Sequence, residues 1–315
     1  MNIIALYDGK IGHENQTKGL LKELKKIRNI TVFEIKSNVK SKFYLSFLRF
    51  LINYLNVKSL KFISFFYTNF ELPTSNIDFI ISSGKETIPL NVALSHYFKS
   101  KNIFIGSSRN FNHEMFYKIL SVTNLGFENN IVLDVPFSLV EIDNSKTKND
   151  IFCLLVGGDG SGYKYDEIDF LHLINLITTL AKSKNIKWVI TTSRRTPKLL
   201  EEALEGLDKE YIEELVIFNK EPKKCLSEFL SIATKIFVTE DSASMIGDAI
   251  SSKKEVFTLK PETILQNSDY LSLLDKYEQK WFLKRVCLSE FNLDSFQFEN
   301  CNKNLNVENI LKELF

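Results

Sequence analysis

The sequence lacks the features that would place it in several large classes of protein. Its formal net charge at pH 7 is only +1, so the chain as a whole has no electrostatic preference for nucleic acid. No uncharged run approaches the ~20 residues that a membrane-spanning helix needs. The opening residues, Met1-Asn-Ile-Ile-Ala-Leu-Tyr-Asp8, do not have the pattern of a signal peptide. We therefore expect a globular protein of the cytoplasm that does not bind nucleic acid.

Cysteine is also scarce, and its spacing excludes the common cysteine-based sites. Cys153, Cys225, Cys287 and Cys301 form no Cys-x-x-Cys pair and no metal-ligand pattern, which is typical of free thiols in a reducing compartment. The sequence also lacks an Asp-x-Asp pair and a Gly-x-Ser-x-Gly motif, so no motif favours hydrolase chemistry. We expect neither a bound metal nor a resident cofactor.

What the sequence does contain is a repeated alternation of short apolar runs and amphipathic segments, which predicts parallel sheets with crossover helices. The predicted strands are 2–7, 31–35, 77–82, 102–105, 118–122, 152–156, 188–191, 215–218, 236–238 and 255–259. The predicted helices are 13–28, a pair within 36–70, 89–99, 166–183, 226–233 and 307–315, with two more beginning at Pro197 and Ser242.

The length of the chain, 315 residues, favours two domains. The polar segment 141–150 has no hydrophobic periodicity and is predicted to be the linker between them. We therefore expect domains at 1–145 and 146–315. The tail from about 290 to 315 is expected to pack back on the first domain.

One stretch, Lys235 to Asp248, has the pattern of a strand, a turn and the start of a helix at Ser242. Backbone N–H groups at such a turn point outward at the positive end of a helix dipole, which makes an anion site. Glu240 on the turn and Asp248 in the helix could reach the same crevice, so a phosphate and a sugar could bind together. The alternative is an ordinary helix whose N-cap is Ser242.

Two further loops follow predicted strands of the same half. The run Gly157-Gly-Asp-Gly-Ser-Gly162 could let the backbone approach a phosphate or sugar closely, or it could be only a flexible turn. Arg194 and Arg195 suit the bidentate capture of phosphate oxygens. The alternative for these arginines is that one of them pairs with Glu201 or Glu202.

In the first half, His13 follows Gly12 at the start of a predicted helix, and Asp8 ends the preceding strand. A helix N-terminus favours a neutral imidazole, which could act as a base that Asp8 orients. The alternatives are a merely polar first-turn residue and a hydrogen-bond donor to a substrate.

The segment 36–70 has six basic residues and no acidic one, with many aromatic and aliphatic residues between them. It predicts two amphipathic helices. Residues 40–67 could lie on an anionic membrane surface, or they could be a helix pair whose aromatic residues belong to the core.

Five segments resemble, in order, the bacterial relatives of the mitochondrial fission ELM1 family, which are regarded as glycosyltransferases. They are Asp8-Gly-Lys-Ile-Gly-His-Glu-Asn-Gln16, Ser82-Ser-Gly-Lys-Glu-Thr-Ile-Pro89, Val156-Gly-Gly-Asp159, Thr191-Thr-Ser-Arg-Arg-Thr196 and Val238-Thr-Glu-Asp-Ser-Ala-Ser-Met245. The resemblance extends to about residue 262. It implies a GT-B architecture, with two Rossmann-like, doubly wound α/β domains facing a cleft.

The resemblance also implies a role for each half. The second domain would hold the nucleotide-sugar and the first the acceptor, with Glu240 or Asp248 on the ribose. The implied donor-binding residues are Gly158, Asp159, Ser161, Arg194, Arg195, Glu240, Asp241, Ser242, Ser244, Met245 and Asp248. The implied acceptor-side residues are Lys10, Glu14, Gln16, Gly84, Lys85 and Arg109, and the implied catalytic residues are His13 and Asp8.

The departures from the family pattern are all in the first domain. Ile11 stands where the family tends to have Pro, and Lys85 where it has Arg. A Gln-Asp-Pro-Arg-like loop reads Gly106-Ser-Ser-Arg109, and a Pro-Glu-His-Asp-like segment is not recognisable near 122–125. The resemblance therefore supports the donor side better than the acceptor side.

The hypothesis that unites these patterns is a metal-independent glycosyltransferase. It would move a sugar from a nucleotide-sugar co-substrate to a glycan or lipid-linked acceptor, in the synthesis of cell-surface polysaccharide or lipopolysaccharide. Its expected location is the cytoplasm, at the inner face of the membrane if residues 40–67 bind lipid. The alternatives are a non-catalytic, membrane-associated scaffold and a sugar-nucleotide 2-epimerase.

Overall fold

The computed structural model describes residues 1–264, 268–296 and 305–315. The chain forms two compact units. Unit 1 consists of Met1–Leu139 together with Leu305–Phe315, and unit 2 of Val140–Asn304. None of the described helices is both long and apolar enough to cross a bilayer.

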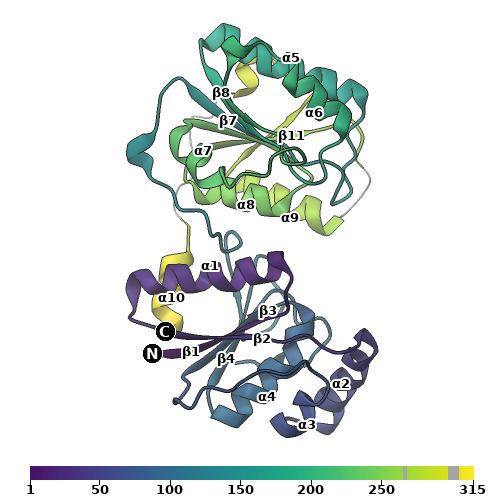
Figure 1. Cartoon of the computed structure of the whole chain (residues 1–315), viewed down its shortest axis with the longest axis vertical. Helices are drawn as coiled ribbons and strands as arrows, with labels where there is room; N and C mark the ends of the chain where they lie inside the picture. The colour runs from purple at the N-terminus through teal and green to yellow at the C-terminus, as the bar shows by residue number, and fades with distance from the viewer. Residues whose placement is uncertain (265–267, 297–304) are drawn as a thin grey trace. The chain divides into compact units, whose positions relative to one another are not determined.

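Unit 1 has a six-stranded parallel sheet in the order β2-β1-β3-β4-β5-β6, with helices on both faces (Figure 1). Its strands are β1 (Asn2–Tyr7), β2 (Thr31–Lys36), β3 (Phe79–Ser83), β4 (Lys101–Ile105), β5 (Lys118–Ser121) and β6 (Asn130–Val132). Helices α1 (Ile11–Ile27) and α10 (Val307–Leu314) cover one face, and α2 (Lys42–Leu55), α3 (Leu60–Ser64) and α4 (Ile88–Phe98) cover the other.

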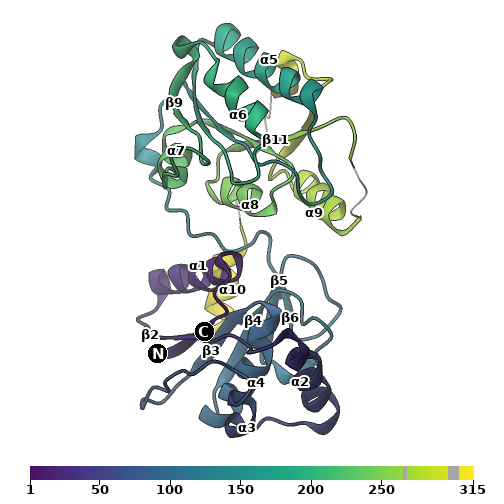
Figure 2. The ribbon, with the colours of Figure 1, turned by 45° about the vertical axis from the view of Figure 1, so that its right-hand side comes forward.

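Strand side chains of unit 1 alternate between two hydrophobic clusters, as the two-residue period of a strand requires. Ile3 and Ala5 join the cluster beneath α1 and α10, whereas Ile4 and Leu6 join the cluster beneath α2, α3 and α4. Helix α10 buries Ile310, Leu311 and Leu314 in the first cluster, and both chain ends lie in this unit (Figure 2). The tail therefore packs on unit 1 from residue 305, while 297–304 and the predicted free thiol Cys301 lie outside the described residues.

Unit 2 repeats this plan with a parallel sheet in the order β12-β11-β10-β7-β8-β9. Its strands are β7 (Ile151–Leu155), β8 (Lys187–Thr191), β9 (Ile212–Val216), β10 (Lys235–Thr239), β11 (Glu255–Lys260) and β12 (Lys284–Cys287). Helices α5 (Glu167–Lys184) and α6 (Lys198–Glu205) cover one face, and α7 (Leu226–Ile232), α8 (Ala243–Ser251) and α9 (Ser268–Gln279) cover the other (Figures 1 and 2).

Each sheet has one point at which the strand order reverses. In unit 1 it lies between β1 and β3, and in unit 2 between β7 and β10. Loops at the carboxyl ends of the strands diverge at such a point and leave a crevice, which is where open α/β sheets bind ligands. The loops after these four strands contain about half of the predicted site residues.

The fold class predicted from the sequence is confirmed, but some elements differ. Helix α1 begins at Ile11, two residues before the predicted start at 13, and β6, α9 and β12 were not predicted. The predicted linker 141–150 is not free of contacts. The backbone of Lys148 and the hydroxyl of Thr147 donate to backbone oxygens of α7, so this segment packs on unit 2.

Candidate functional site

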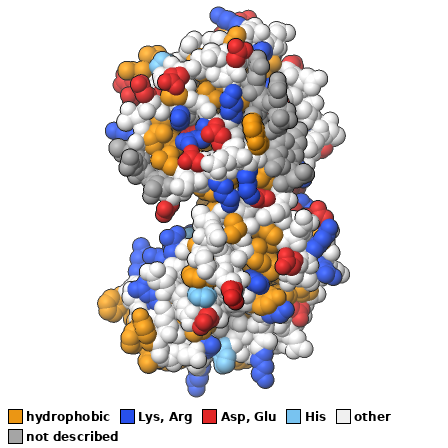
Figure 3. Space-filling model, turned by 180° about the vertical axis from the view of Figure 1, so that it is seen from behind, with side chains coloured by type: hydrophobic (Ala, Val, Ile, Leu, Met, Phe, Trp, Pro, Cys, Tyr) orange, Lys and Arg blue, Asp and Glu red, His pale blue; other side chains and the backbone are white. Residues whose placement is uncertain are grey.

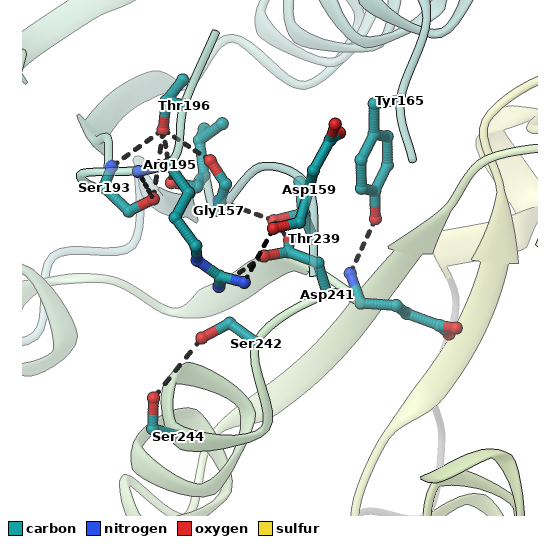
Figure 4. A network of polar contacts seen from close by, with 12 residues as sticks. Gly157, Asp159, Tyr165, Ser193, Arg195, Thr196, Thr239, Asp241, Ser242 and Ser244 are labelled. Carbon is teal, nitrogen blue, oxygen red and sulfur yellow. Dashed lines mark hydrogen bonds and ion pairs between the residues drawn. The ribbon is translucent and has the colours of Figure 1, made fainter. Parts of the chain in front are cut away.

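A group of predicted donor-side residues meets at the switch point of unit 2 (Figure 4). The guanidinium of Arg195, after β8, donates to the Asp241 carboxylate at 2.7 Å and to the backbone oxygen of Asp159 at 3.0 Å. The Asp241 side chain is fully buried, whereas that of Arg195 is 41% exposed. The side chain of Arg195 thus connects the loops after β7, β8 and β10.

Two threonine hydroxyls, which sequence reasoning missed, hold the same loops together. The Thr239 hydroxyl accepts from the backbone N–H of Gly157 and donates to Asp241, both at 2.7 Å. The Thr196 hydroxyl donates to the backbone oxygen of Gly157 at 2.5 Å. The crevice is therefore shaped by a buried polar network.

Three glycines of the run 157–162 leave room for this network. A Cβ on Gly157 would lie 2.2 Å from the carboxylate oxygens of Asp241. A Cβ on Gly158 would lie 2.0 Å from the backbone oxygen of Arg195, and one on Gly160 would lie 1.8 Å from Nη1 of the same residue. The sequence predicted close approach of a phosphate or sugar to this backbone. In the structure, the groups that approach these glycines closely are Arg195 and Asp241.

Helix α8 starts beside Arg195 without a side-chain cap. Ser242 occupies the N-cap position, but its hydroxyl lies 3.4 Å from that of Ser244 instead of accepting from a backbone N–H. Among the described residues, no hydrogen-bond partner is found for the N–H groups of Ala243, Ser244 and Met245. These groups carry the partial positive charge of the helix terminus, so this end of α8 can accept an anion.

The electrostatics at this edge single out Arg194. Burial raises the pKa of the Asp241 carboxyl, although the hydrogen bond from Thr239 and the charge of Arg195 act to lower it. Arg195 therefore already compensates a buried carboxylate. Arg194 is exposed and makes no hydrogen bond or ion pair within the described ranges, so its charge is available to a ligand.

The remaining predicted donor-side residues are Asp159, Ser161, Met245 and Asp248. The side chain of Asp159 is exposed, and Ser161 lies in a tight turn closed by backbone hydrogen bonds between Gly160 and Tyr163. Met245, in the first turn of α8, and Asp248, one turn later, are both half-buried.

Glu240 has a different role from the predicted one. Its side chain is fully buried, and the guanidinium of Arg285 donates to its two carboxylate oxygens at 2.8 and 2.9 Å. The hydroxyls of Tyr163 and Thr258 donate to the same carboxylate, each at 2.7 Å. No part of this carboxylate is open to a ribose, so the prediction that Glu240 binds one is corrected to a structural ion pair between β10 and β12.

Two more tyrosines complete the surroundings of Glu240. The Tyr270 hydroxyl donates to the backbone oxygen of Glu240 at 2.6 Å. The backbone N–H of Glu240 donates to the Tyr165 hydroxyl at 2.9 Å. Burial raises the pKa of each tyrosine hydroxyl well above the ordinary range, so both stay protonated. The signal that sequence reasoning could have used was Glu240 itself, since a carboxylate after a buried strand needs a partner.

A second group of predicted residues meets at the switch point of unit 1. The imidazole Nδ1 of His13, in the first turn of α1, lies 2.7 Å from the buried carboxylate of Asp8, after β1. Gly84, after β3, has a φ of +90°, and a Cβ there would lie 2.2 Å from Nδ1 of His13. Only glycine fits this position without separating the pair.

The charge of Asp8 fixes the tautomer of His13. Burial acts to raise the pKa of the Asp8 carboxyl, but the bonds from His13 and the backbone of Lys10 outweigh it and leave the pKa below its usual value. An ionised carboxylate only accepts, so Nδ1 of His13 carries the proton. The other nitrogen, Nε2, has no partner among the described residues and, in the neutral ring, is a free base.

His13 lines an open pocket of about 400 Å³ within unit 1. The amine of Lys10 donates to Glu86 at 2.6 Å, and Lys85 and Arg109 add two further cations to the wall. Arg109 is held at a φ of +52°, which is uncommon for a residue other than glycine. The remaining lining residues are Ser83, Gly84, Phe104, Ile105, Gly106 and Ser107.

Two predicted acceptor-side residues are engaged elsewhere. The Glu14 carboxylate accepts from Lys18 at 2.9 Å, one turn along α1, and the Gln16 amide donates to the backbone oxygen of Phe137 at 3.3 Å. Neither residue lines the pocket. Over the parts of the chain that the structure describes, no cluster of His, Cys, Asp or Glu could hold a metal ion.

Comparison with known proteins is consistent with this arrangement. Residues 140–276 match the model of the family described as mitochondrial fission ELM1, which confirms the resemblance over most of unit 2. No curated protein matches the chain in sequence.

Solved structures match over both units. UDP-GlcNAc 2-epimerase from Methanocaldococcus jannaschii is similar with a TM-score of 0.57 and 15% identity, covering 100% of this chain and 99% of that one. The S. aureus MnaA–UDP co-structure has a TM-score of 0.52 and 11% identity, covering 99% of this chain and 87% of that one. The glycotransferase of kitacinnamycin has a TM-score of 0.51 and 9% identity, covering 93% of this chain and 88% of that one. At these identities the likeness shows the GT-B fold alone.

Proposed function

We propose that the chain is a glycosyltransferase that uses a nucleotide-sugar. The observation that carries the proposal is the uncapped amino end of α8 beside Arg195, at the switch point of unit 2. Backbone N–H groups, two serine hydroxyls and Arg194 at this edge are the groups that bind a diphosphate. The ELM1 resemblance of residues 140–276 supports the same assignment.

In this proposal, unit 2 holds the donor and stabilises its leaving group. Negative charge grows on the diphosphate as the bond from the anomeric carbon to its oxygen breaks. The N–H groups of Ser244 and Met245 and the guanidinium of Arg194 meet that charge, so no metal ion is needed. With Glu240 buried, we assign the ribose to Asp248, at the next turn of α8.

Unit 1 binds the acceptor and supplies the base. Nε2 of His13 takes the proton from an acceptor hydroxyl, whose oxygen then bonds to the anomeric carbon of the sugar. Asp8 stabilises the imidazolium that forms. Lys85 and Arg109 suit an acceptor that carries negative charge, such as a phosphate-linked glycan of the cell surface.

A panel of UDP-, GDP-, ADP- and CMP-sugars tests donor binding by thermal shift. We expect one nucleotide class to stabilise the protein. Arg194→Ala should weaken its binding roughly tenfold to a hundredfold, because a hydrogen bond from a charged group to phosphate contributes about 1.5–3 kcal/mol. The unfolding temperature without ligand should not change, since Arg194 holds no other described residue.

The matched control is Lys198→Ala, which removes a cation of the next helix that is 85% exposed. If no nucleotide-sugar stabilises the protein, the account gives way to the scaffold alternative. If a nucleotide-sugar binds and is returned with its sugar epimerised at C2, in the absence of any acceptor, the chain is an epimerase.

A further inference from the structure

Helices α2 and α3 present an exposed aromatic surface on unit 1. We call it the aromatic face and define it as Phe43, Phe47, Phe50 and Tyr54 of α2 together with Phe62 and Phe65. Phe43 exposes 80% of its surface, Tyr54 76% and Phe65 73%. Hydrophobic side chains stand out over these helices in the space-filling view, with basic side chains beside them (Figure 3).

Helix α2 is apolar on two faces, and only one of them belongs to the core. Leu48, Leu51 and Ile52 are buried in the cluster that packs on the sheet. Phe43, Phe47, Phe50 and Tyr54 follow the i, i+4, i+7, i+11 spacing of a second stripe, which faces outward. Core packing explains the first stripe but not the second.

Most of the exposed rings are in contact within two groups. The ring of Phe66, at the rim of the core, lies 5.9 Å from that of Phe47, 5.4 Å from Phe62 and 5.5 Å from Phe65. Phe50 and Tyr54 are in contact at 5.3 Å. Large apolar patches of this kind on a protein surface mark interaction sites.

The charge carried by the segment that forms α2 and α3 has one sign. Residues 36–70 carry six basic side chains and no acidic one. Lys42, at the start of α2, and Lys61, within α3, are exposed, and Lys58, between the two helices, is half-buried. Two copies of this face would repel each other, which disfavours a symmetric dimer. Aromatic rings that reach into the headgroup region, with lysines around them, are the pattern of a protein bound to an anionic bilayer surface.

We propose that the aromatic face docks on an anionic lipid bilayer. The rings insert at the level of the headgroups, and Lys42, Lys58 and Lys61 pair with lipid phosphates. This docking does not depend on donor binding by unit 2.

The aromatic face is also connected to the acceptor pocket. The amide of Asn53, on α2, donates to the backbone oxygen of Asn110 at 2.8 Å and accepts from the backbone N–H of Asn112 at 2.9 Å. The loop that these bonds hold contains Arg109, which lines the pocket. Docking would thus bring the pocket wall near the membrane, where a lipid-linked acceptor lies. This last step rests on the proposed function.

Flotation with vesicles tests the docking directly. Wild-type protein should float with vesicles of phosphatidylcholine and phosphatidylglycerol, and much less with phosphatidylcholine alone. Replacing Phe43, Phe47, Phe50 and Tyr54 together by Ser should lower the partition coefficient at least about tenfold. Replacing Lys42, Lys58 and Lys61 by Gln should lower it about tenfold to a hundredfold and reduce its dependence on salt.

Ile168, Leu171 and Leu199 provide the control, because they are exposed apolar residues of unit 2. Their replacement by Ser should leave flotation unchanged. Circular dichroism and an unchanged unfolding temperature establish that each variant is folded.

Equal flotation of the wild type with neutral and anionic vesicles would overturn the proposal, as would normal flotation of the aromatic variant. Self-association without lipid binding, abolished in that variant, would assign the face to a second copy instead. Loss of flotation with donor binding intact separates this proposal from the proposed function.

Discussion

Replacing His13 by Ala should lower the rate of sugar transfer about 10²- to 10⁴-fold, the contribution of a positioned general base. The donor should still bind, because His13 lies in unit 1 and the proposed donor site in unit 2. The measurement is transfer from the nucleotide-sugar that stabilises the protein, with donor binding followed in parallel by thermal shift.

Two further variants act on the same imidazole without removing it. In Asp8→Asn, the amide donates to Nδ1, so the proton moves to Nε2 and the base is lost. In Gly84→Ala, the new methyl displaces the ring from Asp8. Both should reduce transfer by amounts similar to that of His13→Ala. His96→Ala, on exposed surface of α4, is the control. If the His13→Ala variant transferred sugar at the wild-type rate, His13 would be excluded as the base.

Arg285→Ala should destabilise unit 2 by about 3–5 kcal/mol, the usual cost of leaving one member of a buried ion pair alone. The side chain of Arg285 is only 11% exposed, and the Glu240 side chain is fully buried. The alanine would leave that carboxylate with only its neutral partners. Urea unfolding, followed through the buried Trp188 of unit 2, measures the change.

The control pair lies on the surface of the same unit. Lys220 is bonded to Glu205 at 2.6 Å, but both side chains are well exposed, so Lys220→Ala should leave the stability nearly unchanged. Glu240→Gln should leave donor binding intact. If Arg285→Ala changed the stability no more than Lys220→Ala did, the structural role of the pair would be wrong. If Glu240→Gln abolished donor binding in a stable protein, the ribose role would be restored.

Local sequence patterns predicted the parts of the two sites that are close in sequence. Asp8 and His13 are five positions apart on either side of one strand-to-helix turn, so their contact follows from the predicted strand and helix alone. The same holds for the start of α8 after β10. In a parallel sheet these turns share one edge, and the topology brings Arg195 to Asp241 across 46 positions.

Sequence patterns could not assign partners across elements that were not predicted. β12 is short, and its Lys284 and Arg285 hide the apolar signal of a strand. Without that strand, Glu240 had no visible cation within reach and was taken for a ligand group. The prediction from the glycine run was ambiguous for a similar reason. A glycine signals a close approach to the backbone but does not identify the group that approaches.

The aromatic segment 36–70 shows a further limit of prediction from sequence patterns. Its periodicity predicted two amphipathic helices, and helices α2 and α3 are present. Hydrophobicity alone cannot say which of two apolar stripes on α2 faces the sheet. Packing decides it, because Leu48 and Ile52 fit the cluster with Ile63 while the rings of Phe43 and Phe47 remain outside.

The central claim is that a nucleotide-sugar binds with its diphosphate on the amino end of α8. Hydrogen–deuterium exchange of the backbone amides, with and without the stabilising nucleotide-sugar, tests it most directly. We predict that the ligand slows exchange at Ala243, Ser244 and Met245 in the wild type, and less so in Arg194→Ala. Unchanged exchange at these three amides while the ligand is bound would contradict the account.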